Sequence, residues 1–181
     1  MQRVIQFSAV LAIIVGVTHE AKAFGVGADI GYSRALVSDG DDANGWGGDL
    51  YIRPLPLPII EPELQLGLHR FSLDAGTADA NMTIYPLLAG ARLYIPAVPV
   101  FVGAHVGVIG TRFSVDGAGS VPGLSDTSWD FGFNVAAGYH FLDLTIIKLG
   151  VIVQYYVIPA SSDTSPDFNM FTAGLDVALG F

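Results

Sequence analysis

The sequence alternates between apolar residues and small or polar residues, and its final segment shows this alternation most regularly. Every second residue from Phe171 to Phe181 is apolar, while the residues between them are Thr, Gly, Asp, Ala and Gly. A period of two is the spacing at which an extended strand places successive side chains on opposite faces. The pattern therefore predicts a β-strand over 171–181 with one apolar face.

Seven earlier segments repeat this alternation, and polar or proline-rich stretches separate them. The predicted strands cover 24–33, 46–53, 60–69, 85–94, 100–111, 129–141 and 148–157. The longer connections are predicted at 38–44, 72–80, 114–126 and 159–167, and the shorter ones at 54–58, 95–99 and 142–144. An even number of strands, with short turns at one end and longer loops at the other, is typical of a transmembrane barrel.

The composition supports a membrane protein that crosses the bilayer with strands. Hydrophobic residues make up 51% of the chain and charged residues 14%, whereas soluble domains are roughly 25% charged. Beyond residue 23, no apolar run approaches the ~18 residues of a spanning helix. The predicted fold is therefore all-β: an eight-stranded antiparallel up-and-down transmembrane β-barrel. Closure would leave no strand edge unpaired in the membrane.

The N-terminus has the pattern of a secretory signal peptide. Arg3 precedes an apolar stretch over 7–17, which ends at Ala21-Lys22-Ala23. A basic start, a short apolar segment and small residues at −3 and −1 predict cleavage after Ala23. The alternative is an N-terminal membrane anchor, for which the apolar run is short. We expect residues 1–23 to be removed and residues 24–181 to form the barrel. No cysteine follows the site, so a lipoprotein is not expected.

The net charge of −9 and the lack of cysteine exclude several classes of function. An acidic chain without a basic run argues against a nucleic acid partner. Without cysteine the chain has neither disulfides nor thiolate metal sites. Asp39, Asp41 and Asp42 suggest calcium, but Ala43 and the missing terminal Glu depart from an EF-hand loop. We expect no cofactor and no metal ion.

The chain resembles the small eight-stranded outer-membrane barrels, of the OmpX and OmpA transmembrane-domain type. The resemblance covers residues 24–181 and rests on the strand architecture and on the terminal pattern. That pattern is similar to the signal read by the outer-membrane assembly machinery, and its residues are Leu175, Val177, Leu179 and Phe181. The resemblance implies an integral protein of the outer membrane that is exported through the periplasm, with both termini on the periplasmic side.

Charged residues of the inward-facing rows should form a polar network in the lumen. These residues are Asp29, Asp49, Arg53, Glu61, Glu63, Arg92, Asp130, Lys148 and Asp176. Single buried charges are costly, so we expect pairing, with Arg92 near Glu61 or Glu63 and Asp29 beside Asp176 at the seam. A polar plug is the preferred interpretation, because eight strands leave little more than side-chain space. The alternative is a narrow pore for cations, because acidic residues outnumber basic ones here.

The three histidines beyond the predicted cleavage site, at 69, 105 and 140, also fall in inward-facing rows. They are spread along the barrel, too far apart for one metal site. Some eight-stranded barrels are lipid A-modifying hydrolases with His and Ser on the outer wall, but no histidine here has that parity. The sequence therefore indicates no catalytic residues and no enzyme activity.

Three arginines share the parity of the apolar, outward-facing rows. Arg34, Arg70 and Arg112 each lie where a strand leads into a longer loop. Guanidinium groups suit bidentate contact with phosphate, so we expect lipopolysaccharide contact here. Ordinary snorkelling at the interface is the overlapping alternative. Aromatic residues fit an outer and an inner girdle: Tyr32, Trp46, Trp129 and Tyr155, and Tyr139, Phe141 and Phe181.

Three functions remain open from the sequence. The leading one is a structural or surface-interaction barrel that contacts outer-membrane lipid, lipopolysaccharide and, during biogenesis, the assembly machinery, and we expect it to be a monomer. The second is a narrow pore for small cations or hydrophobic solutes. The third is a secreted lipocalin-like barrel, which would place the apolar rows inside.

Overall fold

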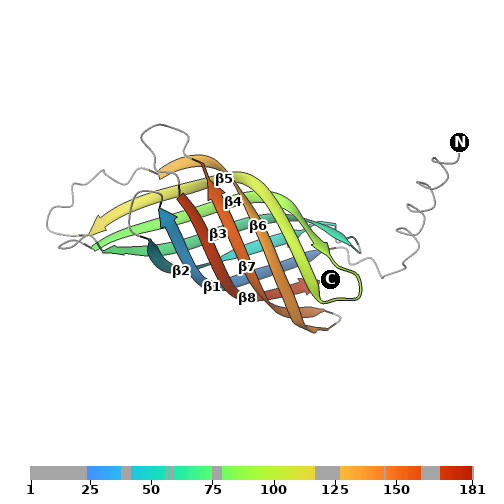
Figure 1. Cartoon of the computed structure of the whole chain (residues 1–181). Helices are drawn as coiled ribbons and strands as arrows, with labels where there is room; N and C mark the ends of the chain where they lie inside the picture. The colour runs from blue at the N-terminus through green and yellow to red at the C-terminus, as the bar shows by residue number, and fades with distance from the viewer. Residues whose placement is uncertain are drawn as a thin grey trace, which may run out of the picture.

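The protein folds into one closed β-barrel (Figure 1). The computed structural model describes residues 24–37, 42–55, 57, 59–74, 79–116, 127–144, 146–159 and 168–180. Each strand pairs antiparallel with its sequence neighbours, and β1 pairs with β8 to close the sheet. The eight strands are β1 (Gly25–Val37), β2 (Ala43–Arg53), β3 (Ile60–Asp74), β4 (Asp79–Tyr94), β5 (Val100–Asp116), β6 (Thr127–Asp143), β7 (Ile147–Ile158) and β8 (Phe168–Gly180).

This architecture confirms the predicted eight-stranded, all-antiparallel up-and-down barrel. The described residues contain no helix that is long and apolar enough to cross a membrane. We call the end where β1 joins β2 the outer end, and the end where β1 starts and β8 finishes the inner end. The predicted signal peptide, residues 1–23, and Phe181 lie outside the described residues.

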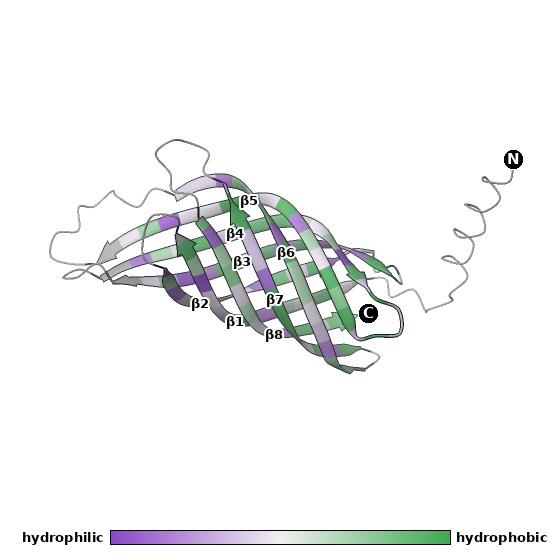
Figure 2. Ribbon diagram, in the orientation of Figure 1, coloured by the Kyte–Doolittle hydropathy of each residue, from purple (hydrophilic) through white to green (hydrophobic). Residues whose placement is uncertain are grey.

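The outer wall of the barrel is apolar, and hydrophobic and hydrophilic residues alternate along the strands (Figure 2). Leu66 is 55% exposed and Phe131 64% exposed, whereas Gln65 is 2% exposed. Leu175 and Val177 of β8 also face outward. This arrangement is opposite to that of a lipocalin, whose apolar residues line the interior, so the lipocalin-like alternative is wrong.

Two of the predicted outer loops are shorter than the sequence suggests. The loop predicted over 72–80 is largely strand, because β3 continues to Asp74 and β4 begins at Asp79. The loop predicted over 114–126 likewise begins later, because β5 runs to Asp116. Backbone pairing continues in these segments although the strict apolar alternation has ended. The part of a strand that extends beyond the apolar outer wall needs no row of apolar side chains. The alternation of apolar residues therefore underestimates the length of these strands.

Candidate functional site

Arg92 of β4 is the centre of a charged cluster in the inner part of the lumen. Its side chain is 2% exposed, and its Nε lies 2.8 Å from Glu63 Oε2. Its Nη1 donates a hydrogen bond to Asp176 Oδ1 at 3.1 Å. The guanidinium also stacks 4.2 Å from the ring centroid of Tyr51 and 4.5 Å from that of Phe101. One cation is thus held by two carboxylates and two aromatic faces.

Arg53 of β2 is the second cation of this cluster. Its Nε donates to Glu63 Oε2 at 3.1 Å, and its Nη1 lies 3.0 Å from Glu61 Oε2. Tyr51 Oη donates to Asp176 Oδ1 at 2.6 Å. Two arginines therefore face three carboxylates, and each buried charge has a partner of opposite sign, which is the condition for keeping ions out of water.

His105 connects this cluster to polar groups closer to the outer end. Its Nε2 lies 3.2 Å from Glu63 Oε1, and its Nδ1 lies 2.8 Å from Asn134 Oδ1. Asn134 Nδ2 in turn donates to Gln154 Oε1 at 2.9 Å. The network therefore passes from β3 through β5 and β6 to β7.

Gln154 extends the network to two aspartates on β1 and β2. Its Nε2 donates to Asp49 Oδ2 at 2.9 Å and to Asp29 Oδ2 at 3.2 Å. Asp49 Oδ1 lies 3.4 Å from His69 Nε2, and His69 Nδ1 lies 3.0 Å from Ser33 Oγ. A connected series of buried polar groups thus runs from the inner part of the lumen to Ser33.

Rings occupy the inner end of the lumen below this network. His140 Nε2 lies 3.1 Å from Asp176 Oδ2. The ring of His140 packs against those of Tyr94 and Phe101, with centroids 5.9 and 5.0 Å apart. Lys148 lies at the rim, with its Nζ 4.9 Å from the Tyr94 centroid and 3.4 Å from Asp143 Oδ2.

The structure brings together seven of the nine predicted lumen residues, directly or through shared partners. These are Asp29, Asp49, Arg53, Glu61, Glu63, Arg92 and Asp176. Lys148 lies apart from these seven, at the inner rim where β7 begins, and its Nζ lies 3.4 Å from Asp143 Oδ2. Asp130 is buried in β6 next to Ile109 in register, nearer the outer end. The expected proximity of Asp29 and Asp176 is present in the register of β1 and β8.

The outer part of the lumen holds an apolar cluster beside buried polar residues such as Asp130, whereas the sequence predicts a polar filling throughout. We call this group the outer-lumen cluster. It receives side chains from every strand except β6: Ala35, Ala43, Phe71, Met82, Ile84, Leu88, Ile109, Tyr156, Ile158, Phe168 and Met170. Tyr156 marks the boundary, because its ring belongs to the cluster while its Oη donates to Asp49 Oδ2 at 2.8 Å.

Several lumen residues were missed because they are neither charged nor on the strict apolar rows. Tyr51, Phe101 and Gln154 are buried inside the barrel. A signal for the large ones exists in the glycines: a Cβ at Gly27 would lie 2.2 Å from the Tyr51 ring, and one at Gly138 would lie 2.2 Å from Phe101. Glycine at these two positions makes room for a neighbouring ring. Part of the outer-lumen cluster has a different signal, namely segments such as 156–158 near the outer strand ends, where both parities are apolar.

The three predicted arginines lie on the outer wall near its outer end. Arg34 donates from Nη2 to Asp42 Oδ2 at 2.7 Å, and its side chain is 49% exposed. Arg70 and Arg112 are both exposed, and both are in register with Thr83 on β4, which lies between them. Trp46 is the neighbour of Arg70 on β2. Cationic groups thus adjoin the outer aromatic girdle.

Within the described part of the chain, no group of three or more His, Asp and Glu side chains is arranged to hold a metal ion. Asp39 and Asp41 of the acidic stretch lie outside the described residues. Asp42, the described member of that stretch, pairs with Arg34.

Comparison with known proteins gives one family and a consistent set of folds. Residues 7–178 match the family described as the outer membrane protein beta-barrel domain. Neisserial surface protein A is 19% identical with a TM-score of 0.64, over 90% of this chain and 100% of that protein. Ail of Yersinia pestis is 16% identical with a TM-score of 0.62, over 87% of this chain and 97% of Ail. At these identities the likeness concerns the fold. No curated protein sequence is significantly similar to this chain.

Proposed function

The chain belongs to the outer membrane protein β-barrel family, and from this premise we propose that it is a closed barrel with a structural or surface-interaction role. The observation that carries the proposal is the filling of the lumen by two sets of side chains. Charged and amide side chains are bonded to one another, and the outer-lumen cluster packs beside them and toward the outer end. An apolar constriction resists wetting, and paired ions offer no free coordination to a passing solute.

We therefore expect no steady ion conductance when the purified barrel is reconstituted in a planar bilayer. A general porin, reconstituted in the same way, is the positive control for insertion and recording. Heat-modified electrophoretic mobility, in which the folded barrel migrates differently until it is boiled, verifies that the sample is folded. Steady cation-selective channels from the folded sample would favour the narrow-pore alternative and would contradict the closed barrel.

The second element of the proposal is contact with lipopolysaccharide through Arg34, Arg70 and Arg112. All three are exposed on the outer wall, and Arg70 adjoins Trp46 of the outer girdle. Lipid A phosphates would lie at this level of an outer-membrane barrel, and guanidinium groups bind phosphate through paired N–H donors.

Replacing all three arginines with Gln should lower the amount of lipopolysaccharide that copurifies with the barrel. Each lost charge-assisted hydrogen bond removes about 1.5–3 kcal/mol of binding energy. The measurement is lipid A quantified per mole of protein after identical detergent extraction. Arg92→Gln is unsuitable as a control because it alters the lumen, so Lys148→Gln, which removes a cation from the inner rim, is the matched control. Unchanged lipid A content in the triple variant would refute this contact.

A further inference from the structure

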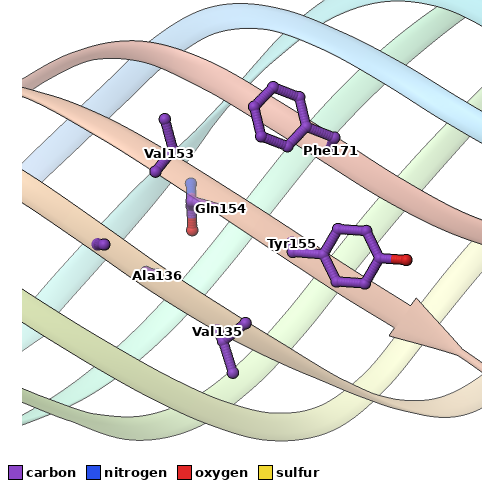
Figure 3. A pocket seen from close by; sticks show the side chains of 7 residues that line it. Val135, Ala136, Val153, Gln154, Tyr155 and Phe171 are labelled. Atoms are coloured by element: carbon purple, nitrogen blue, oxygen red, sulfur yellow. The ribbon is translucent and has the colours of Figure 1, made fainter.

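A shallow apolar trough crosses the outer wall over β6, β7 and β8 (Figure 3). It has a volume of about 200 Å³. The floor of the trough is formed by Ala137 of β6 and Val153 of β7, which are cross-strand neighbours in one row. The trough is bordered on the outer side by the next row, which consists of Val135, Tyr155 and Phe171.

The row that forms the floor of the trough continues through Ala173 toward the outer end of the barrel. Ala173 is paired with Tyr32 of β1, and the same row continues through Trp46 to Arg70. Ala137 lies in the inner half of β6, whereas Trp46 and Arg70 lie near the outer ends of β2 and β3. The row therefore runs from the middle of the apolar outer wall to the outer aromatic girdle.

Arg34 is placed to bind the head group of a lipid lying in this trough. It is the Cα partner of Phe171 across the β1–β8 seam, and Phe171 borders the trough. The Arg34 side chain is 49% exposed, and only its Nη2 is bonded, to Asp42 Oδ2 at 2.7 Å, among the contacts of the described residues. A guanidinium has five N–H donors, so a phosphate can share it with Asp42.

We propose that the trough is a binding site for one acyl chain of a lipid A-type phosphorylated glycolipid, whose phosphate is bound by Arg34. The inference rests on the proposed lipopolysaccharide contact and assigns it to a particular wall of the barrel. A row of small side chains between larger ones gives an extended chain contacts on its floor and its border, and these dispersion contacts add along its length. The arginine at the upper end selects a lipid with a phosphate in the outer leaflet.

The test measures binding of purified bisphosphorylated lipid A to the barrel in detergent micelles by native mass spectrometry. Ala137→Phe fills the trough, and Arg34→Gln removes the cation. Ala89→Phe is the matched control, because Ala89 is exposed on the outer face of β4 between Leu64 and Val106, far around the wall. Wild type and Ala89→Phe should retain the lipid equally.

We expect Ala137→Phe to weaken binding severalfold and Arg34→Gln to weaken it about tenfold, the ratio for losing one charge-assisted hydrogen bond. Removing the phosphates from lipid A should weaken binding to wild type more than it weakens binding to Arg34→Gln. Heat-modified mobility verifies folding, and Val153→Phe fills the trough if Ala137→Phe does not fold.

Equal binding by wild type, Ala89→Phe and the folded trough variant would overturn the acyl-chain site. If the triple Arg→Gln variant still lost lipid A in that case, the proposed lipopolysaccharide contact would stand and only its assignment to the trough would fail. If the triple variant also bound lipid A normally, both the acyl-chain site and the proposed lipopolysaccharide contact would be refuted.

Discussion

Replacing Arg92 with Gln is expected to lower the free energy of unfolding of the barrel by about 3–5 kcal/mol, the cost of breaking a buried ion pair by removing one partner. Arg92 is 2% exposed and contacts both Glu63 and Asp176. Gln keeps a polar end but no charge, so two carboxylates would lose the cation that compensates them. Arg53 still reaches Glu63 Oε2, whereas Asp176 retains only neutral donors and His140.

Urea unfolding of the barrel in lipid vesicles, followed by heat-modified mobility, measures this loss. Arg112→Gln is the matched control, because it removes the same group from the exposed outer wall, where an ion is worth less than about 1 kcal/mol. Adding Asp176→Asn to Arg92→Gln should restore part of the stability, because it removes the carboxylate that is left without an arginine. A loss from Arg92→Gln no larger than that from Arg112→Gln would contradict an ion-paired role for Arg92 in the lumen.

Replacing Phe71 with Ala is expected to cost about 3–5 kcal/mol, as for a buried Phe in a soluble protein. Phe71 is fully buried in the outer-lumen cluster, next in register to Gly45 and Met82. Lipid cannot enter a closed lumen to fill the space left by the ring. The lost contacts would therefore remain unmade.

Phe131→Ala is the matched control, because Phe131 is 64% exposed on the outer wall and acyl chains can replace its contacts there. The same urea titration should give a clearly smaller loss for Phe131→Ala than for Phe71→Ala. Equal losses would mean that the outer-lumen cluster does not act as a packed core.

The fold could be predicted from the sequence because a lipid-facing wall imposes a strict period of two. In β6 the alternation from Trp129 to Phe141 indicates both the strand and its faces, and the structure agrees. The ends of β3 and β5 could not be predicted in this way. Backbone pairing there does not depend on an apolar row, so the strands continue to Asp74 and Asp116.

The contacts in the lumen could be predicted from the sequence only where a buried charged side chain needs a partner of opposite sign. The alternation places the side chains of Arg92 and Glu63 in the lumen. Because β3 and β4 are adjacent strands, the contact between these two residues follows from the register of one strand pair. Contacts across the lumen, such as Gln154 with Asp49, join strands that are distant around the barrel. They depend on how far each side chain reaches across the lumen, which a period-two pattern does not encode. The outer-lumen cluster was missed because apolar residues on both faces look like an interrupted alternation.

Asp176 has one more consequence, which concerns the order of assembly. It lies on the last strand, and its carboxylate meets Tyr51 of β2, Arg92 of β4 and His140 of β6. Until β8 arrives, Arg92 lacks one of its two anions and the open sheet has two unpaired edges. The same strand thus supplies the final backbone ladder and the second carboxylate that contacts Arg92, so the Arg92 site is completed only when the barrel closes.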